Sequence, residues 1–154
     1  MVSSTTLFVG FAAAASFVAA SPTGPPTGST SDKEVYKITN FFSRKPEGVD
    51  ISTLSFDIAA KDGLKLTCHP YDPATSTSTN NFEDKHVYAC GKDSPFSFSF
   101  ENAANKLWLW HTVDSTILIG NATVINQCRA AGHGPNDKVC QQAGSAEVTM
   151  IKTG

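Results

Sequence analysis

The histidines and carboxylates are the side chains whose types could support acid–base catalysis. A small nuclease or glycosidase needs one group as a general base and another as an acid. The candidates for these two roles are His69, His86, His111 and His133, with Asp57, Asp62, Glu83 and Asp84. No spacing forces these groups together, and neither a GxSxG nor an HExxH motif is present. We therefore interpret them as ordinary surface residues and predict that the protein is not an enzyme and has no cofactor.

The cysteines could bind a metal or form disulfides. Zinc-ligand types occur together in the sequence near Cys68 and again near Cys90, but no CxxC pair is present, and oxidation would remove the thiolates that zinc needs. We therefore favour structural disulfides and predict no metal site. Four cysteines permit three pairings, and their order alone does not select one. These cysteines are Cys68, Cys90, Cys128 and Cys140.

The amino-terminal residues indicate an oxidising compartment. Residues 1–31 contain no Asp, Glu, Lys or Arg, and Leu7 to Ala20 form an apolar run that is short for a bilayer span. The small residues that end this run fit a signal-peptidase site before Ser21. We predict that residues 1–20 are a cleaved signal peptide. The mature protein is then expected to be secreted, extracellular and without a membrane anchor, and its cysteines can be oxidised.

The rest of the chain is expected to form one domain. Residues 21–32 consist almost entirely of Pro, Gly, Ser and Thr, so they cannot bury enough apolar surface to fold and are predicted to be a flexible leader. Residues 33–154 are enough for a single domain with a modest core. The formal net charge is -2, so no basic field for nucleic acid or anionic lipid is present.

Apolar and polar residues alternate along several short stretches. In LSFDI (54–58) and FSFSF (96–100) every second residue is apolar, which is the period of a strand with one buried face. Outside the signal peptide, no stretch keeps the apolar period of a helix over ten residues. The sequence therefore predicts an all-β sandwich or barrel. About eight strands are expected, at 35–41, 54–58, 64–68, 87–90, 96–100, 107–112, 116–124 and 147–151.

Three loops separate these strands in ways that matter for recognition. The stretch from Cys128 to Cys140, CRAAGHGPNDKVC, is predicted to be a turn-rich loop. The charged turn from Arg44 to Gly48 could recognise a partner, although a solvated hairpin connection is the favoured interpretation. The polar stretch from His69 to Asp84 is interpreted as a mobile surface loop. The candidate recognition residues of the first loop are Arg129, His133, Asn136, Asp137 and Lys138.

Two further features lie on predicted strands. Asn121 begins the glycosylation sequon Asn-Ala-Thr, which a secreted protein could modify, although three-residue motifs are common by chance. Trp108 and Trp110, with Phe41 and Phe42, could form a binding patch or a subunit contact. A place in the core is the favoured interpretation of these aromatic residues.

Five blocks of the sequence together resemble a known family. They are YKITNFFSRKPEG (36–48), LSFDI (54–58), EDKHVYACG (83–91), FSFSF (96–100) and CRAAGHGPNDKVC (128–140). Their order and spacing are similar to those of the secreted fungal family typified by the major allergen of Alternaria. The resemblance covers 33–154 and implies a compact antiparallel β-barrel that is peculiar to fungi and has two intrachain disulfides. It also implies that Cys68 pairs with Cys90 and Cys128 with Cys140.

The chain departs from that family in two places. The type allergen has an extra cysteine just before the domain that bridges a dimer, whereas residues 21–34 contain none, so a monomer or a noncovalent dimer is expected. The stretch from Tyr71 to Asn81 is longer than the corresponding family loop, so the role of the region 69–86 is left open.

The resemblance carries the functional expectation. Members of the family are known as allergens and as effectors or elicitors of plant defence, and the family implies no catalysis. The leading hypothesis is therefore a secreted, noncatalytic fungal effector that binds an extracellular host protein. The alternative is a carrier whose aromatic residues line a cavity for a small apolar or aromatic ligand. A filled barrel with an exposed patch would favour the first hypothesis, and a wide cavity would favour the second.

Overall fold

The alternating sequence folds into an antiparallel sheet. The computed structural model describes residues 33–153, in which every element is a strand. The strands are β1 (Lys33–Lys45), β2 (Thr53–Ala60), β3 (Lys65–Cys68), β4 (Tyr71–Asp72), β5 (Thr77–Ser78), β6 (Tyr88–Ala89), β7 (Phe96–Glu101), β8 (Lys106–Val113), β9 (Thr116–Thr123), β10 (Asn126–Ala130), β11 (Lys138–Gln142) and β12 (Ala146–Lys152). The predicted signal peptide (1–20) and leader (21–32) lie outside the described residues. Among residues 33–153 no helix has the length and apolar composition needed to cross a membrane.

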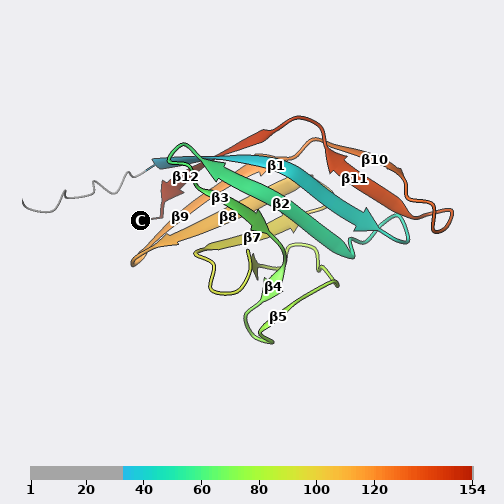
Figure 1. Ribbon diagram of the computed structural model, residues 1–154, viewed down its shortest axis with the longest axis horizontal. Coiled ribbons are helices and arrows are strands. Elements are labelled where there is room, and N and C mark those ends of the chain that lie inside the picture. Colours follow the sequence, from blue (N-terminus) through green and yellow to red (C-terminus); the bar gives the residue numbers. More distant parts are fainter. Residues whose placement is uncertain (1–32, 154) are drawn as a thin grey trace, which may run out of the picture. The chain divides into compact units, whose positions relative to one another are not determined.

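The sheet curls into a barrel that a disulfide closes. Its ladder runs β3-β2-β1-β12-β9-β8-β7-β6-β4-β5, and the β10–β11 hairpin joins the ladder beside the second half of β1. Figure 1 shows β1 and β2 lying across β8 and β9, so the curled sheet covers its own inner face. No ladder joins β3 to β6, but Cys68 at the end of β3 is bonded to Cys90, directly after β6. This bond and the short link from β3 to β4 hold the two sides of the sheet together where no backbone hydrogen bonds join them.

The barrel interior is filled by aromatic rings. The alternating residues Phe96, Phe98 and Phe100 of β7 all point inward and are at most 1% exposed. The rings pack in pairs, with centroids 4.9 Å apart for Phe56 and Phe98 and 4.7 Å apart for Phe41 and Phe100. Such edge-to-face and tilted contacts are the arrangements that aromatic quadrupoles favour. All-β structure, antiparallel pairing and two disulfides are confirmed.

A bulge in β1 changes which residues face the core. The register between β1 and β2 shifts between Thr39 and Phe42, where Asn40 has a φ of 55°. The side chain of Gln142 on β11 repairs the interrupted ladder, because it accepts a hydrogen bond from Phe41 N at 3.1 Å and donates one to Ile38 O at 3.1 Å. The bulge therefore lets one long strand pair with β12 along its first half and with β11 along its second.

Two loop predictions need correction. The stretch from Cys128 to Cys140 lies within a hairpin, residues 126–142, of two five-residue strands in which the two cysteines face each other, and only residues 131–137 connect the strands. The stretch from His69 to Asp84 contains a small hairpin of β4 and β5. The sequence does not predict these two hairpins, because their strands lack alternating apolar residues. None of the four strands contributes a continuous apolar face to the core.

The tryptophans are not in the core. Leu107 and Leu109 of β8 are 0% exposed, and Trp108 and Trp110 alternate with them, half-buried on the outer face of the barrel. Of the two phenylalanines grouped with them, Phe41 is buried and Phe42 is half-buried. The core interpretation is therefore right for Phe41 and wrong for both tryptophans.

Candidate recognition site

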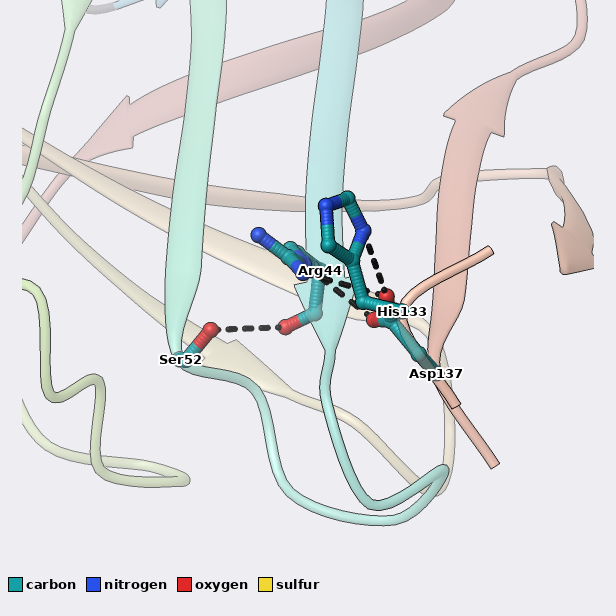
Figure 2. A network of polar contacts seen from close by, with 4 residues as sticks. All are labelled: Arg44, Ser52, His133 and Asp137. Atoms are coloured by element: carbon teal, nitrogen blue, oxygen red, sulfur yellow. Dashed lines mark hydrogen bonds and ion pairs between the residues drawn. The ribbon is translucent and has the colours of Figure 1, made fainter. Parts of the chain in front are cut away.

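An ion pair joins the end of β1 to the β10–β11 hairpin. Arg44 Nε donates to Asp137 Oδ1 at 3.1 Å, and Arg44 Nη2 donates to Asp137 Oδ2 at 3.0 Å. This is a bidentate salt bridge between residues that are far apart in the sequence. Asp137 is 2% exposed, and hydrogen bonds from the Arg44 guanidinium hold the pKa of its carboxyl below the usual value. His133, whose side chain is 75% exposed, places Nδ1 3.4 Å from the same carboxylate. Figure 2 shows contacts from both Arg44 and His133 to the Asp137 carboxylate, and the Ser52 hydroxyl bonded to the Arg44 carbonyl.

The two connecting segments also touch through their backbones. Gly48, in the connection between β1 and β2, has a φ of +80° and donates its N–H to Lys45 O at 3.0 Å. A Cβ atom at this position would lie 3.0 Å from the carbonyl oxygen of Asn136 in the hairpin tip. Glycine is thus required twice, by the left-handed backbone and by the close approach. We call the connection 46–50 and the hairpin residues 131–138 together the loop-end surface.

A second polar network holds the β1–β2 connection of the loop-end surface in place. Lys45 Nζ donates to Asn102 Oδ1 at 2.6 Å, and Asn102 Nδ2 donates to Val49 O at 3.0 Å. The N–H of Asn102 in turn donates to Asp84 Oδ1 at 2.7 Å. Burial lowers the pKa of Lys45, and the nearby Lys138 adds to this effect. The network fixes the β1–β2 connection against the turn that follows β7.

A shallow hollow lies next to this network. It has a volume of about 320 Å³, and its lining includes three carboxylates. The lining residues are Asp50, Ile51, Asn81, Phe82, Glu83, Asp84 and Asn102. In the described part of the chain, no three His, Cys, Asp or Glu side chains are arranged to hold a metal ion. The hollow adds negative charge beside the positive Lys45 and Lys138.

The five candidate recognition residues fall into three structural groups. Arg129 and Lys138 are exposed strand residues of β10 and β11, and His133 and Asn136 are exposed in the hairpin tip. Asp137 is buried against Arg44, so it holds the tip in place and is not available as a contact residue. Cys128 and Cys140 are bonded directly across the hairpin, and Cys68 and Cys90 form the other disulfide that the resemblance implies.

The candidate acid–base residues serve other roles or stand apart in the fold. His69 and His86 are exposed, and the side chain of neither forms a hydrogen bond or ion pair within residues 33–153. Asp57 accepts hydrogen bonds from Asn40 and Thr67 at 2.7 Å each, and these bonds lower the pKa of its carboxyl. Asp57 therefore ties the β1 bulge to β3 and acts as a structural group.

A polar cluster around His111, which the sequence did not suggest, lies at the opposite end of β1. His111 Nδ1 is 2.9 Å from Glu34 Oε2 and 2.8 Å from the hydroxyl of Tyr36, which also donates to Glu34. The His111 ring stacks on Phe96 with centroids 4.1 Å apart. Burial, followed by the neighbouring Glu34 carboxylate, raises the pKa of Tyr36. The cluster closes this end of the core with satisfied polar groups.

The sequence offered weak signals for the residues that build the loop-end surface. Arg44 and Asp137 both lie in segments with turn signals, but nothing in their separate positions in the sequence indicates that they pair. Asn102 and Gln142 bond to backbone groups of distant strands, and such contacts depend on the complete fold. Only the paired turn signals, a Pro and a Gly in each segment, pointed to this part of the molecule.

Comparison with known proteins defines the class to which this small, disulfide-closed, all-β chain belongs. Residues 38–140 match the family model described as Alternaria alternata allergen 1. The major allergen Alt a 1 of Alternaria alternata is 37% identical over 145 residues, which are 92% of this chain and 88% of that protein. Allergen Ulo b 1 of Alternaria botrytis is 38% identical over 135 residues, or 86% of this chain and 93% of that protein.

Solved structures agree with the sequence comparison. Two crystal structures of the Alternaria alternata allergen Alt a 1 superpose with TM-scores of 0.67 and 0.68, each at 36% sequence identity. They cover 78% and 84% of this chain, and the chain covers 94% and 95% of theirs. The chain therefore belongs to the Alternaria alternata allergen 1 family, and the resemblance described above is confirmed.

Proposed function

We propose that the protein is a secreted, noncatalytic fungal effector that binds an extracellular protein of a host plant and triggers or modulates its defence. The loop-end surface is the observation that carries this proposal. Two segments almost a hundred residues apart are locked together by the Arg44–Asp137 pair, and they present exposed polar side chains from a fixed frame. A rigid polar surface lowers the entropy cost of binding a protein partner.

The filled interior supports protein recognition over the carrier hypothesis. The five phenylalanines Phe41, Phe56, Phe96, Phe98 and Phe100 are each at most 1% exposed. Four of their rings pack against one another, and the ring of Phe96 packs on Tyr36 and His111. A ligand of drug-like size needs a cavity of about 300 Å³ or more, and opening one here would break these ring contacts. A hydrophobic ligand in the barrel interior is therefore disfavoured on packing grounds.

The noncatalytic part of the proposal is supported by the surroundings of the titratable groups. Asp57 and Asp137 hold strands and hairpins together through their hydrogen bonds, and His111 closes the core. The relatives reported above are named as allergens and not as enzymes. The same names suggest that this protein is itself a potential allergen, acting as a monomer or as a noncovalent dimer.

Capture from plant apoplastic fluid tests the proposal. The mature protein is immobilised, bound proteins are identified by mass spectrometry, and two variants are compared with the wild type. The loop-end variant combines His133→Ala and Asn136→Ala in the loop-end surface with Arg129→Ala on the adjoining strand β10, and it leaves Asp137 in place. The matched control combines Thr75→Ala, Thr77→Ala and Asn80→Ala, exposed changes in the small β4–β5 hairpin region.

Three outcomes separate the possibilities. We expect a host protein that binds the wild type and the control but not the loop-end variant, and a defence response that the loop-end variant fails to induce. A response of equal strength from all three proteins would contradict the assigned surface. Absence of both binding and response with wild-type protein would contradict the effector proposal.

A further inference from the structure

The outer face of strands β7, β8 and β9 carries an aromatic patch in register with a glycosylation sequon. Trp108 on β8 lies directly opposite Asn121 on β9 and Ser99 on β7, so these three side chains form one row. The next row places Trp110 beside Ile119. Because strand neighbours are about 5 Å apart, the whole outer face is within reach of a group attached to Asn121.

This face is unusually apolar for the outside of a barrel. Val87, Ile117 and Ile151 are 49%, 46% and 56% exposed, the last two on strands that continue the face beyond Ile119. A groove of about 420 Å³ crosses it, and its lining residues are Lys85, Val87, Ser99, Glu101, Trp108, Trp110 and Ile119. Contiguous apolar patches on soluble proteins commonly mark places where another molecule or group binds.

An unpartnered hydroxyl lines the groove beside the indoles. Ser99 is 5% exposed as a residue, and its hydroxyl, which has no hydrogen-bond partner within the described residues 33–153, stays accessible from the groove. Lys85 and Glu101 form an ion pair at 3.1 Å on the rim of the groove. Lys106 Nζ already lies 4.9 Å from the centroid of the Trp108 ring. A covering group that presents both C–H surfaces and hydroxyls would pack on the indole surface that this cation leaves open and would reach the Ser99 hydroxyl.

Asn121 is placed where such a group could be attached. Its neighbours Gly120 and Ala122 face the core, so Asn121 and Thr123 point outward and both are exposed. The Asn121 side chain has no hydrogen-bond partner among residues 33–153, so its amide nitrogen is free for modification. N-glycosylation acts on the chain as it enters the secretory pathway, so the later position of the sequon in a strand does not prevent it.

We propose that Asn121 carries an N-linked glycan whose first sugars lie over Trp108 and extend toward Ser99. Asn121 Nδ2 loses one proton and bonds to C1 of the first sugar, while the bond from C1 to a lipid-linked diphosphate donor breaks and the lipid diphosphate leaves. The C–H face of a sugar ring carries partial positive charge and packs on the negative face of an indole. This inference rests on the proposed secretion, because the glycan donor is present only in the secretory pathway.

Expression of the full chain in a eukaryotic secretory host tests the attachment. Intact mass should show an excess that an N-glycan endoglycosidase removes. Thr123→Ser keeps the sequon and should retain the excess, whereas Thr123→Ala and Asn121→Gln should lose it. Secreted protein without the excess would overturn this inference while leaving secretion intact. Unmodified protein that stays inside the cells would overturn both the inference and the proposed secretion.

Tryptophan fluorescence tests where the glycan lies. Trimming the glycan from folded wild-type protein should increase quenching by acrylamide, because Trp108 and Trp110 are the only tryptophans in the chain. In a Trp108→Thr variant the increase should be smaller, since only Trp110 remains to report. Quenching that does not change when the wild-type glycan is trimmed would show that the sugars extend into solvent and would overturn their placement over Trp108.

Discussion

The disulfide between Cys68 and Cys90 should stabilise the domain more than the disulfide between Cys128 and Cys140. The perturbation is the replacement of each pair by alanines in separate double variants. Cys68 and Cys90 are 0% and 3% exposed and join two strands that no ladder connects. Cys128 is exposed, and its bond to Cys140 spans a hairpin in which all five residues of one strand already pair with the five residues of the other.

The size of the effect follows from the loops that the bonds close. Sequence separations of 22 and 12 residues correspond to about 3.4 and 2.8 kcal/mol in the chain-entropy treatment. For a domain of about 120 residues, 1 kcal/mol changes Tm by roughly 4 °C. Loss of the first bond should therefore lower Tm by about 13 °C, and loss of the second by about 11 °C at most. The intact hairpin ladder should reduce the second effect further, because it keeps the two strands together.

Thermal melts of the two double variants, followed by circular dichroism in the same buffer, measure this difference. The wild-type protein melted with and without a reductant is the control, since reduction should reproduce the combined loss. A larger decrease in Tm for the Cys128→Ala and Cys140→Ala variant would refute the reasoning. It would mean that the hairpin bond, and not the closure between β3 and β6, holds the barrel together.

Four other expectations can be checked with simple variants. The pKa of the Asp137 carboxyl is lowered, so its pairing with Arg44 stabilises the fold at pH values above the ordinary carboxyl pKa of about 3.9. This stabilisation is lost as the pH falls through the lowered pKa. Asp137→Asn should therefore flatten the dependence of Tm on pH in that acidic range. Gly120→Ala should lower the free energy of unfolding by about 1 to 3 kcal/mol, because its Cβ would lie 2.5 Å from Thr149 O and 2.8 Å from Val148 Cγ1. The urea midpoint should fall accordingly, and an unchanged midpoint would disprove this packing. Secreted protein should begin at Ser21 and contain no free thiol by intact mass before and after reduction, and two free thiols would be inconsistent with the disulfides. Single alanine variants of His69, His86 and His111, which lie outside the loop-end surface, should keep defence-eliciting activity, and a tenfold loss in a folded variant would revive the enzyme hypothesis.

The strands with a buried face could be predicted from the sequence, and the others could not. FSFSF and LSFDI lie in β7 and β2, because alternation reports burial of one face directly. β10 and β11 have no such pattern: their stability comes from pairing with each other and with β1, which depends on residues elsewhere in the chain. Trp108 and Trp110 were assigned to the core because large aromatic residues are usually buried, whereas their register places them outside.

The candidate site was predicted only in its parts. Turn residues identified both the Arg44 to Gly48 segment and the tip of the hairpin, since Gly and Pro act locally. Their contact through Asp137 and through the carbonyl of Asn136 is a consequence of the β1 bulge and the β11 pairing. Local signals therefore locate such loops, but only the assembled sheet determines that they form one surface.

Hydrogen exchange on the protein with and without its captured host partner tests the loop-end surface most directly. Binding should slow exchange of backbone amides in residues 46–50 and 131–138, and leave β4 and β5 unchanged. The loop-end variant, exposed to the same partner, should show no protection. Protection confined to the outer face of β7, β8 and β9, with residues 131–138 exchanging as fast as in the free protein, would contradict recognition by the loop-end surface.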